Sequence, residues 1–184
     1  MSNRNTRRRR AQGGFTLIEL LITIGVMVML AGLYIFNDDP SKTKGKVVYS
    51  MLMEYGNALL RAKTDLSCHP TRMDALWTQG NVQTTSCGLD LRPQWNGPYA
   101  RQANTDVNGN ILVNQIGPTT TLAIRSAAGG VGTQWFVRAA NVPNDMITHA
   151  MIACNGSATA TGKCVGAVGG AGTGTLDLLF DETR

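Results

Sequence analysis

The sequence lacks the short motifs that mark several common enzyme classes. It contains no Gly-x-Ser-x-Gly nucleophile turn, no phosphate-binding glycine loop and no His-Glu-x-x-His zinc helix. Histidine is scarce, since only His69 and His149 are present, and the carboxylates are scattered. Structural or solvated roles explain both histidines better than catalysis does. These absences predict a protein that is not an enzyme and that holds no metal and no cofactor.

Positive charge is also scarce outside the first fourteen residues. The chain has 17 lysines and arginines against 12 acidic residues, but Arg4 and Arg7–Arg10 all fall within residues 1–14, which hold no acid. Residues 15–184 therefore carry 12 basic and 12 acidic side chains, a net charge of zero. This balance gives no argument for nucleic acid as a partner.

One long hydrophobic run, Phe15–Phe36, dominates the N-terminal part of the chain. It is 22 residues long and contains a single charge, Glu19. A helix of that length is about 33 Å long, and the hydrocarbon core of a bilayer is about 30 Å thick. Arg7–Arg10 stand before the run, and no positive charge follows it before Lys42. The positive-inside rule predicts that the N-terminus is cytoplasmic and that the chain beyond Phe36 lies across the membrane.

Glu19 needs compensation, because a carboxylate at the centre of a membrane span costs about 2.5–3.5 kcal/mol, and less near an end. If the chain is cut between Gly14 and Phe15, Phe15 carries a new α-amino group. Side chains on a helix lean toward its N-terminus. The Glu19 carboxylate could then pair with that amine, in its own chain or in a neighbouring copy. The alternative is a plain one-pass anchor with a tolerated glutamate near the interface.

Residues 14–20 read Gly-Phe-Thr-Leu-Ile-Glu-Leu after a short basic leader. This segment resembles the class III signal of type IV prepilins and of their relatives, the type II secretion pseudopilins and the competence pilins. The resemblance covers about residues 7–36. It implies that a membrane aspartyl prepilin peptidase cleaves after Gly14, that Phe15 is N-methylated, and that Glu19 helps to dock each subunit into a helical filament.

A second helix is expected at residues 37–66. Pro40 disfavours helical conformation at Asp39 and can kink or interrupt the helix there. The apolar residues that follow have helical spacing and form one face: Val48, Met51, Leu52, Tyr55, Leu59 and Ala62. The opposite side is polar, with Glu54, Asn57, Arg61 and Asp65. Gly45 and Gly56 each weaken such a helix by about 1 kcal/mol against alanine, which predicts places where it bends or melts.

Short alternating segments after residue 110 predict an antiparallel sheet. Strands are expected at 111–116, 121–125, 133–139 and 175–180. A short helix is expected at 144–153, with its buried side formed by Met146, Ile147, Ala150 and Met151. Residues 106–110 read Asp-Val-Asn-Gly-Asn, which fits a hairpin turn better than half of a calcium loop.

All four cysteines lie beyond the hydrophobic run, at Cys68, Cys87, Cys154 and Cys164. An even number outside the cytoplasm favours disulfides. Three pairings are possible, of which the local one, Cys68 with Cys87 and Cys154 with Cys164, closes the shortest loops. A zinc site is the rival interpretation, but no Cys-x-x-Cys is present.

The predicted fold is therefore α+β and similar to that of pilins. Residues 1–14 form a leader, 15–36 a transmembrane or filament-core helix, 37–66 its amphipathic continuation, and 67–184 a head with an antiparallel sheet and a disulfide-bounded C-terminal loop. The resemblance implies a subunit of a type IV pilus, made in the inner membrane with a periplasmic head and then exported to the cell surface. Its expected partners are copies of itself, the prepilin peptidase, the inner-membrane assembly platform and membrane lipid. The alternatives are a type II secretion pseudopilin, a DNA-binding competence pilin, and a membrane-anchored periplasmic binding protein.

Overall fold

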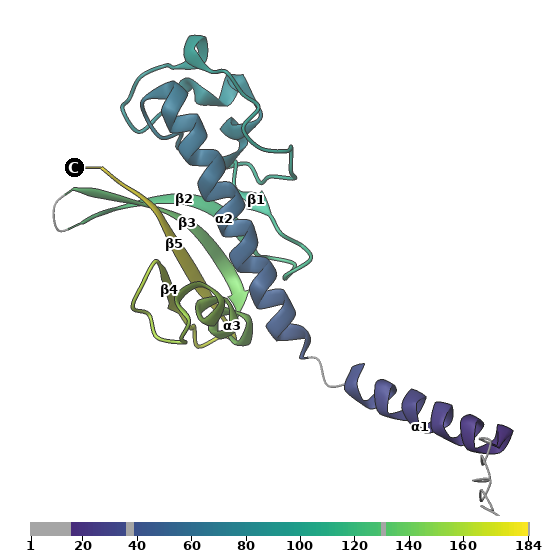
Figure 1. The fold of residues 1–184 in the computed structure, drawn as a ribbon. Coiled ribbons are helices and arrows are strands. Elements are labelled where there is room, and N and C mark those ends of the chain that lie inside the picture. The colour runs from purple at the N-terminus through teal and green to yellow at the C-terminus, as the bar shows by residue number, and fades with distance from the viewer. Residues whose placement is uncertain (1–15, 36–38, 130–131, 184) are drawn as a thin grey trace, which may run out of the picture. The chain divides into compact units, whose positions relative to one another are not determined.

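The computed structural model describes residues 16–35, 39–129 and 132–183, and the side chains of residues 32–35 are not described. The chain divides into two compact units, residues 1–38 and residues 39–184. The first contains the helix α1, Leu17–Ile35. The second is called the head below (Figure 1).

The head begins with the helix α2, Pro40–Leu66. Asp39 caps it, because its carboxylate accepts a hydrogen bond from the Ser41 amide at 2.9 Å, and Pro40 occupies the first turn, where no amide donor is needed. At the other end Ser67 adopts a left-handed conformation with φ of 60°, and its amide donates to the Lys63 carbonyl. The helix therefore begins directly after the residue that the sequence marks as an interruption.

The sheet has five strands, and all neighbours are antiparallel in the order β1-β2-β3-β5-β4. Their bounds are Ile111–Leu112 for β1, Thr121–Ala128 for β2, Thr133–Pro143 for β3, Cys164–Ala167 for β4 and Thr173–Thr183 for β5. The helix α3, Asn144–Asn155, connects β3 to β4. Three 3₁₀ turns, Met73–Leu76, Gln79–Gln83 and Arg92–Gln94, lie between α2 and the sheet.

Helix α2 lies across one face of the sheet, as Figure 1 shows. The core between them is formed by α2 residues such as Leu52 and Leu59 and by strand residues such as Val137 and Leu176, all of which have no exposed surface. The predicted α+β fold, a helix packed on a small antiparallel sheet, is confirmed. The two faces of α2 follow the prediction. On the apolar face Val48, Leu52, Leu59 and Ala62 are buried and Met51 and Tyr55 are half-buried, whereas the opposite side is exposed: Glu54, Asn57, Arg61 and Asp65.

The strand boundaries differ from the sequence prediction. The strand expected at 111–116 ends at Leu112, because the chain turns there: the amides of Ile116 and Gly117 both donate to the Val113 carbonyl. The other three strands are longer than expected, since main-chain pairing continues past their alternating segments. Helix α3 extends two residues beyond the predicted end, and its four predicted core residues, Met146, Ile147, Ala150 and Met151, are buried.

Candidate functional site

The helix α1 exposes its apolar side chains all around its circumference. Every side chain described from Leu17 to Ala31 is exposed, and the exposed fraction reaches 80% at Leu17 and 75% at Met29. An aliphatic side chain gains about 1.5–3 kcal/mol when it is fully buried. The apolar surface of α1 would therefore gain free energy if lipid or another polypeptide covered it.

Glu19 is the one charged residue of α1 and lies in its first turn. Its amide donates to the Thr16 carbonyl at 3.0 Å, so the carboxylate stands at the positive end of the helix dipole. That position lowers the cost of an isolated carboxylate in an apolar helix. The predicted cleavage and methylation residues, Gly14 and Phe15, lie outside the described residues, as does the leader.

Residues 9–35 match the family model described as the prokaryotic N-terminal methylation motif. The chain carries a type IV prepilin-like signal. This motif is that of a type IV pilin-like or pseudopilin precursor, and it indicates a structural subunit rather than an enzyme. No curated protein and no solved structure matches the chain.

Within the part of the chain that the structure describes, no helix is long and hydrophobic enough to span a membrane. The predicted span starts at Phe15 and ends at Phe36, and both residues lie outside that part. The membrane assignment of this prepilin-like segment therefore stays a prediction.

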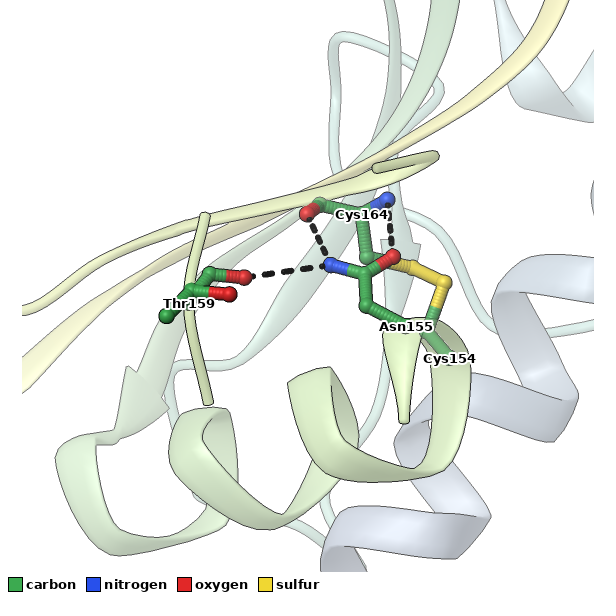
Figure 2. Close-up of a disulfide and its surroundings, with 4 residues drawn as sticks. All are labelled: Cys154, Asn155, Thr159 and Cys164. Atoms are coloured by element: carbon green, nitrogen blue, oxygen red, sulfur yellow. Dashed lines mark hydrogen bonds between the residues drawn. A yellow bond between two sulfur atoms is a disulfide. The ribbon is translucent and has the colours of Figure 1, made fainter. Parts of the chain in front are cut away.

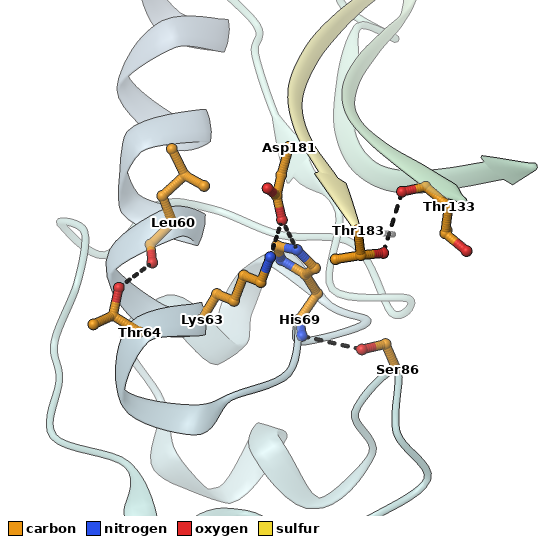
Figure 3. A network of polar contacts seen from close by, with 8 residues as sticks. All are labelled: Leu60, Lys63, Thr64, His69, Ser86, Thr133, Asp181 and Thr183. Carbon is orange, nitrogen blue, oxygen red and sulfur yellow. Dashed lines mark hydrogen bonds and ion pairs between the residues drawn. The ribbon is translucent and has the colours of Figure 1, made fainter. Parts of the chain in front are cut away.

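The head of this prepilin-like chain holds a buried polar network at the end of α2 (Figure 3). His69 is 1% exposed, and its Nε2 lies 2.7 Å from Oδ2 of Asp181 on β5, which also accepts a hydrogen bond from Lys63 on α2. Because Nε2 donates to a carboxylate, the proton of the neutral ring is on Nε2. The network ties the C-terminal strand to the helix and to the loop that follows it.

Burial sets the charge state of this histidine. Desolvation lowers the pKa of His69 and outweighs the hydrogen bond and negative charge of Asp181, which raise it. Burial alone raises the pKa of Asp181, but the hydrogen bonds and charges of Lys63 and His69 together lower it. His69 is thus a neutral structural residue near neutral pH, and Lys63 supplies the counter-charge of Asp181.

A buried carboxylate, Asp177 on β5, joins three strands. Arg138 on β3 donates to both of its oxygens at 2.7 Å, and Arg125 on β2 donates to one of them at 3.0 Å. The hydrogen bond and charge of Asp177 raise the pKa of Arg138 against the lowering effect of burial. Cross-strand charge pairs of this kind fix the register of the sheet.

The structure joins Cys68 to Cys87 and Cys154 to Cys164, the local pairing. Figure 2 shows how Asn155 supports the second bridge. Its side-chain oxygen accepts from the Cys164 amide at 3.1 Å, and its side-chain nitrogen donates to the Cys164 carbonyl at 2.7 Å. The Asn155 side chain thus pairs with the main chain of Cys164 as a neighbouring strand would, and it holds the C-terminal loop against the end of α3.

The segment weighed as half of a calcium loop is a hairpin turn. Asp106 accepts hydrogen bonds from the amides of Asn108 and Asn110, and Gly109 has a φ of 79°. The Arg72 guanidinium binds the nearby Asp74 carboxylate and reaches the Val107 carbonyl at 3.4 Å. A positive charge is therefore already present beside these oxygen atoms. Among the residues described, no group of three or more potential metal-binding His, Cys, Asp or Glu side chains occurs.

Helix α3 packs closely against the N-terminal part of α2 at Gly45. A Cβ atom on Gly45 would lie 2.6 Å from Cβ of His149 and 2.8 Å from the Met146 carbonyl oxygen. Beside this contact the Ser41 hydroxyl donates to Asp145. His149 Nε2 also lies 3.4 Å from Asp39, the residue that caps α2. The sequence predicts only that Gly45 weakens the helix, and it does not predict this close helix–helix contact. The spacing of three residues between Gly45 and Val48 does place Gly45 on the buried face of α2.

Proposed function

We propose that this chain is a structural subunit of a type IV pilus. In this proposal the leader is removed after Gly14, Phe15 is N-methylated, and the mature chains polymerise through their N-terminal helices. The observation that carries it is the prepilin-like signal on a helix whose described apolar side chains are all exposed. The head, in contrast, has its own buried core.

The mechanism is a transfer of apolar surface between two environments. Before assembly, lipid of the inner membrane covers α1 and the head is periplasmic. On extraction, α1 buries the same surface against other copies in the centre of a filament on the cell surface. Because apolar burial contributes about 25 cal/mol per Å², side chains such as Leu17 and Met29 make a filament of many copies stable outside lipid.

Glu19 sets the register of this packing. A carboxylate left unpaired in a filament core costs several kcal/mol, so each Glu19 needs a positive partner. The methylated amine of Phe15 keeps its charge and is the natural partner, in the same chain or in the neighbouring one. The prepilin peptidase and the inner-membrane assembly platform are the further partners of this proposal.

The test compares the wild-type chain with Glu19→Ala and Thr23→Ala. Thr23 is a suitable control because it lies in the same exposed helix and its hydroxyl bonds within the helix, to the Leu20 carbonyl at 2.9 Å. We expect all three chains to be cleaved, with only Glu19→Ala nearly absent from filaments sheared from cells. A normal filament yield from Glu19→Ala would contradict the proposed role of Glu19 in setting the register.

Intact mass and N-terminal sequence of the wild-type chain decide the proposal itself. A mature chain that starts at methylated Phe15 and is abundant in the sheared fraction supports a pilus subunit. Cleaved chain found in the membrane alone would instead indicate a minor pilin or a pseudopilin. Uncleaved chain would leave a membrane-anchored protein with a periplasmic binding head.

A further inference from the structure

A pocket of about 370 Å³ lies at the distal part of the β2–β3 hairpin, beside the Cys68–Cys87 loop. Six residues line it: Thr71, Ser86, Ile124, Ser126, Thr133 and Trp135. Four of these side chains are hydroxyls, one is an indole and one is aliphatic, and none is charged. The size falls within the range of about 300–1,000 Å³ that is usual for small-molecule sites.

The floor of the pocket continues the core face of the sheet. Ser126 and Trp135 are opposite each other in the β2–β3 ladder, so their side chains lie on one face. Two residues further along β3, on that same face, Val137 is fully buried in the core. Along β2 the face changes from buried Leu122 to exposed Ser126. Along this face of β2, the buried aliphatic side chain of Leu122 thus gives way to the exposed hydroxyl of Ser126.

The lining hydroxyls keep hydrogen-bonding capacity. Ser86 accepts from the His69 main-chain amide at 3.0 Å, which leaves its own proton free to donate, and Figure 3 draws it below the His69 ring. Thr71 donates to the Thr84 carbonyl and can still accept. The hydroxyls of Ser126 and Thr133 form no hydrogen bond with any residue that the structure describes.

Trp135 adds an aromatic surface and an unpaired donor. Its ring is half-buried and packs on the His69 ring with a centroid distance of 4.4 Å. Its indole Nε1 is buried and has no hydrogen-bond partner among the described residues. A buried N–H without an acceptor is unfavourable and uncommon. Because this nitrogen has almost no accessible surface, a ligand in the pocket would contact the exposed part of the Trp135 ring.

We propose that this pocket binds a neutral, hydroxyl-rich ligand, namely one saccharide unit of a glycan. A saccharide offers apolar C–H faces to an aromatic ring, and its hydroxyls both donate and accept, as the pocket requires. An anion finds no positive side chain in the lining. An aliphatic ligand would take water away from the hydroxyls of Ser126 and Thr133, which have no other partner among the described residues. The proposal does not depend on the filament function.

The experiment follows the three indole N–H signals of the full chain, labelled with ¹⁵N-tryptophan, in micelles of a detergent without a sugar headgroup. Glucose, galactose and N-acetylglucosamine are added in turn, with cyclohexanol as a probe of similar size that lacks most of the hydroxyls. We expect the Trp135 signal to move with a Kd of about 1 mM for at least one sugar, as suits a small neutral ligand. The Trp95 signal is an internal control, because its Nε1 already donates to the Ala75 carbonyl at 3.0 Å.

Two variants of equal charge separate this site from general effects. Ser126→Arg fills the pocket and is expected to weaken binding at least about tenfold. Ser157→Arg, on an exposed residue of the C-terminal loop, should bind as the wild type does. If Ser126→Arg also shifts the Trp95 signal in the absence of sugar, Thr133→Val replaces it, since it removes one hydroxyl at nearly constant volume.

No movement of the Trp135 signal with any of the sugars would overturn the proposal. Equal titrations of Ser126→Arg and Ser157→Arg would also overturn it, because the sugar would then bind elsewhere. Cyclohexanol binding as tight as sugar binding would show an apolar crevice instead of a saccharide site.

Discussion

Substitution of Gly45 by alanine sets two effects of opposite sign against each other. Gly45 lies inside α2, and alanine is favoured over glycine in a helix interior by about 1 kcal/mol. On helix propensity alone, Gly45→Ala would stabilise the head. The geometry of the α2–α3 contact predicts the opposite.

The added methyl group would meet α3 at three atoms. These are His149 Cβ at 2.6 Å, the Met146 carbonyl oxygen at 2.8 Å and the Ala150 amide nitrogen at 3.1 Å. Two of them are main-chain atoms and the third is the root of a side chain, so a rotamer change gives no relief. Overpacking costs about 1–3 kcal/mol, and a displaced α3 also loses the Ser41–Asp145 hydrogen bond, about 1 kcal/mol. After the gain of about 1 kcal/mol in helix propensity, we expect a net loss of about 1–3 kcal/mol of unfolding free energy.

Gly56→Ala is the matched control in the same helix. Its Cβ would lie 3.2 Å from the Phe180 Cβ and 3.7 Å from the Phe180 Cγ, so a shift of β5 by a few tenths of an ångström accommodates it. We expect a change between zero and a small gain. Denaturant unfolding of the full chain in micelles, followed by tryptophan fluorescence, measures both, because all three tryptophans lie in the head. A Gly45→Ala head as stable as wild type, or an equal loss in Gly56→Ala, would refute the argument.

Two further predictions concern His69 and the Cys154–Cys164 disulfide. Folding lowers the pKa of His69 below its ordinary value of 6.5, so the unfolded chain binds more protons than the folded chain below about pH 6.5. The free energy of unfolding should therefore fall as the pH drops through 6.5. His69→Gln should flatten this pH dependence, measured as the urea midpoint between about pH 7 and 5. Replacement of Cys154 and Cys164 by serine opens a loop with a sequence separation of 10 residues and should cost about 2–3 kcal/mol, measured by thermal unfolding, with less loss if the Asn155 contacts hold the loop in place.

Much of the fold could be predicted from local signals. The spacing of Val48, Leu52 and Leu59 defines a buried helical face without reference to the rest of the chain. Asp39 followed by Pro40 defines the start of α2 for the same reason, since capping and the proline ring act within one turn. The segment around Gly14 and Glu19 was recognisable because the signal is a contiguous sequence.

The missing parts depend on residues far apart in the chain. β3 continues to Pro143 because β5 pairs with it as far as Thr173, and no pattern within β3 records that partner. The sequence favours a structural or solvated role for His69 without choosing between them, because its environment is made by Asp181 on β5, 112 residues away. A short polar side chain between a cysteine and a proline carries no sign of burial.

Carboxylates have basic partners in the head but none within α1. Within the head, the buried Asp177 and the half-buried Asp181 have arginine or lysine partners, whereas α1 carries Glu19 and no basic residue at all. Its counter-charge has to come from a chain end or from another molecule. On the proposed function, the leader precedes Phe15 in the precursor and the Phe15 nitrogen is a neutral amide. Cleavage after Gly14 would turn it into a cation four residues from Glu19. On the proposed function, processing thus creates the positive group that a carboxylate inside the filament requires, and a chain cleaved but blocked by acetylation at that amine should assemble as poorly as Glu19→Ala.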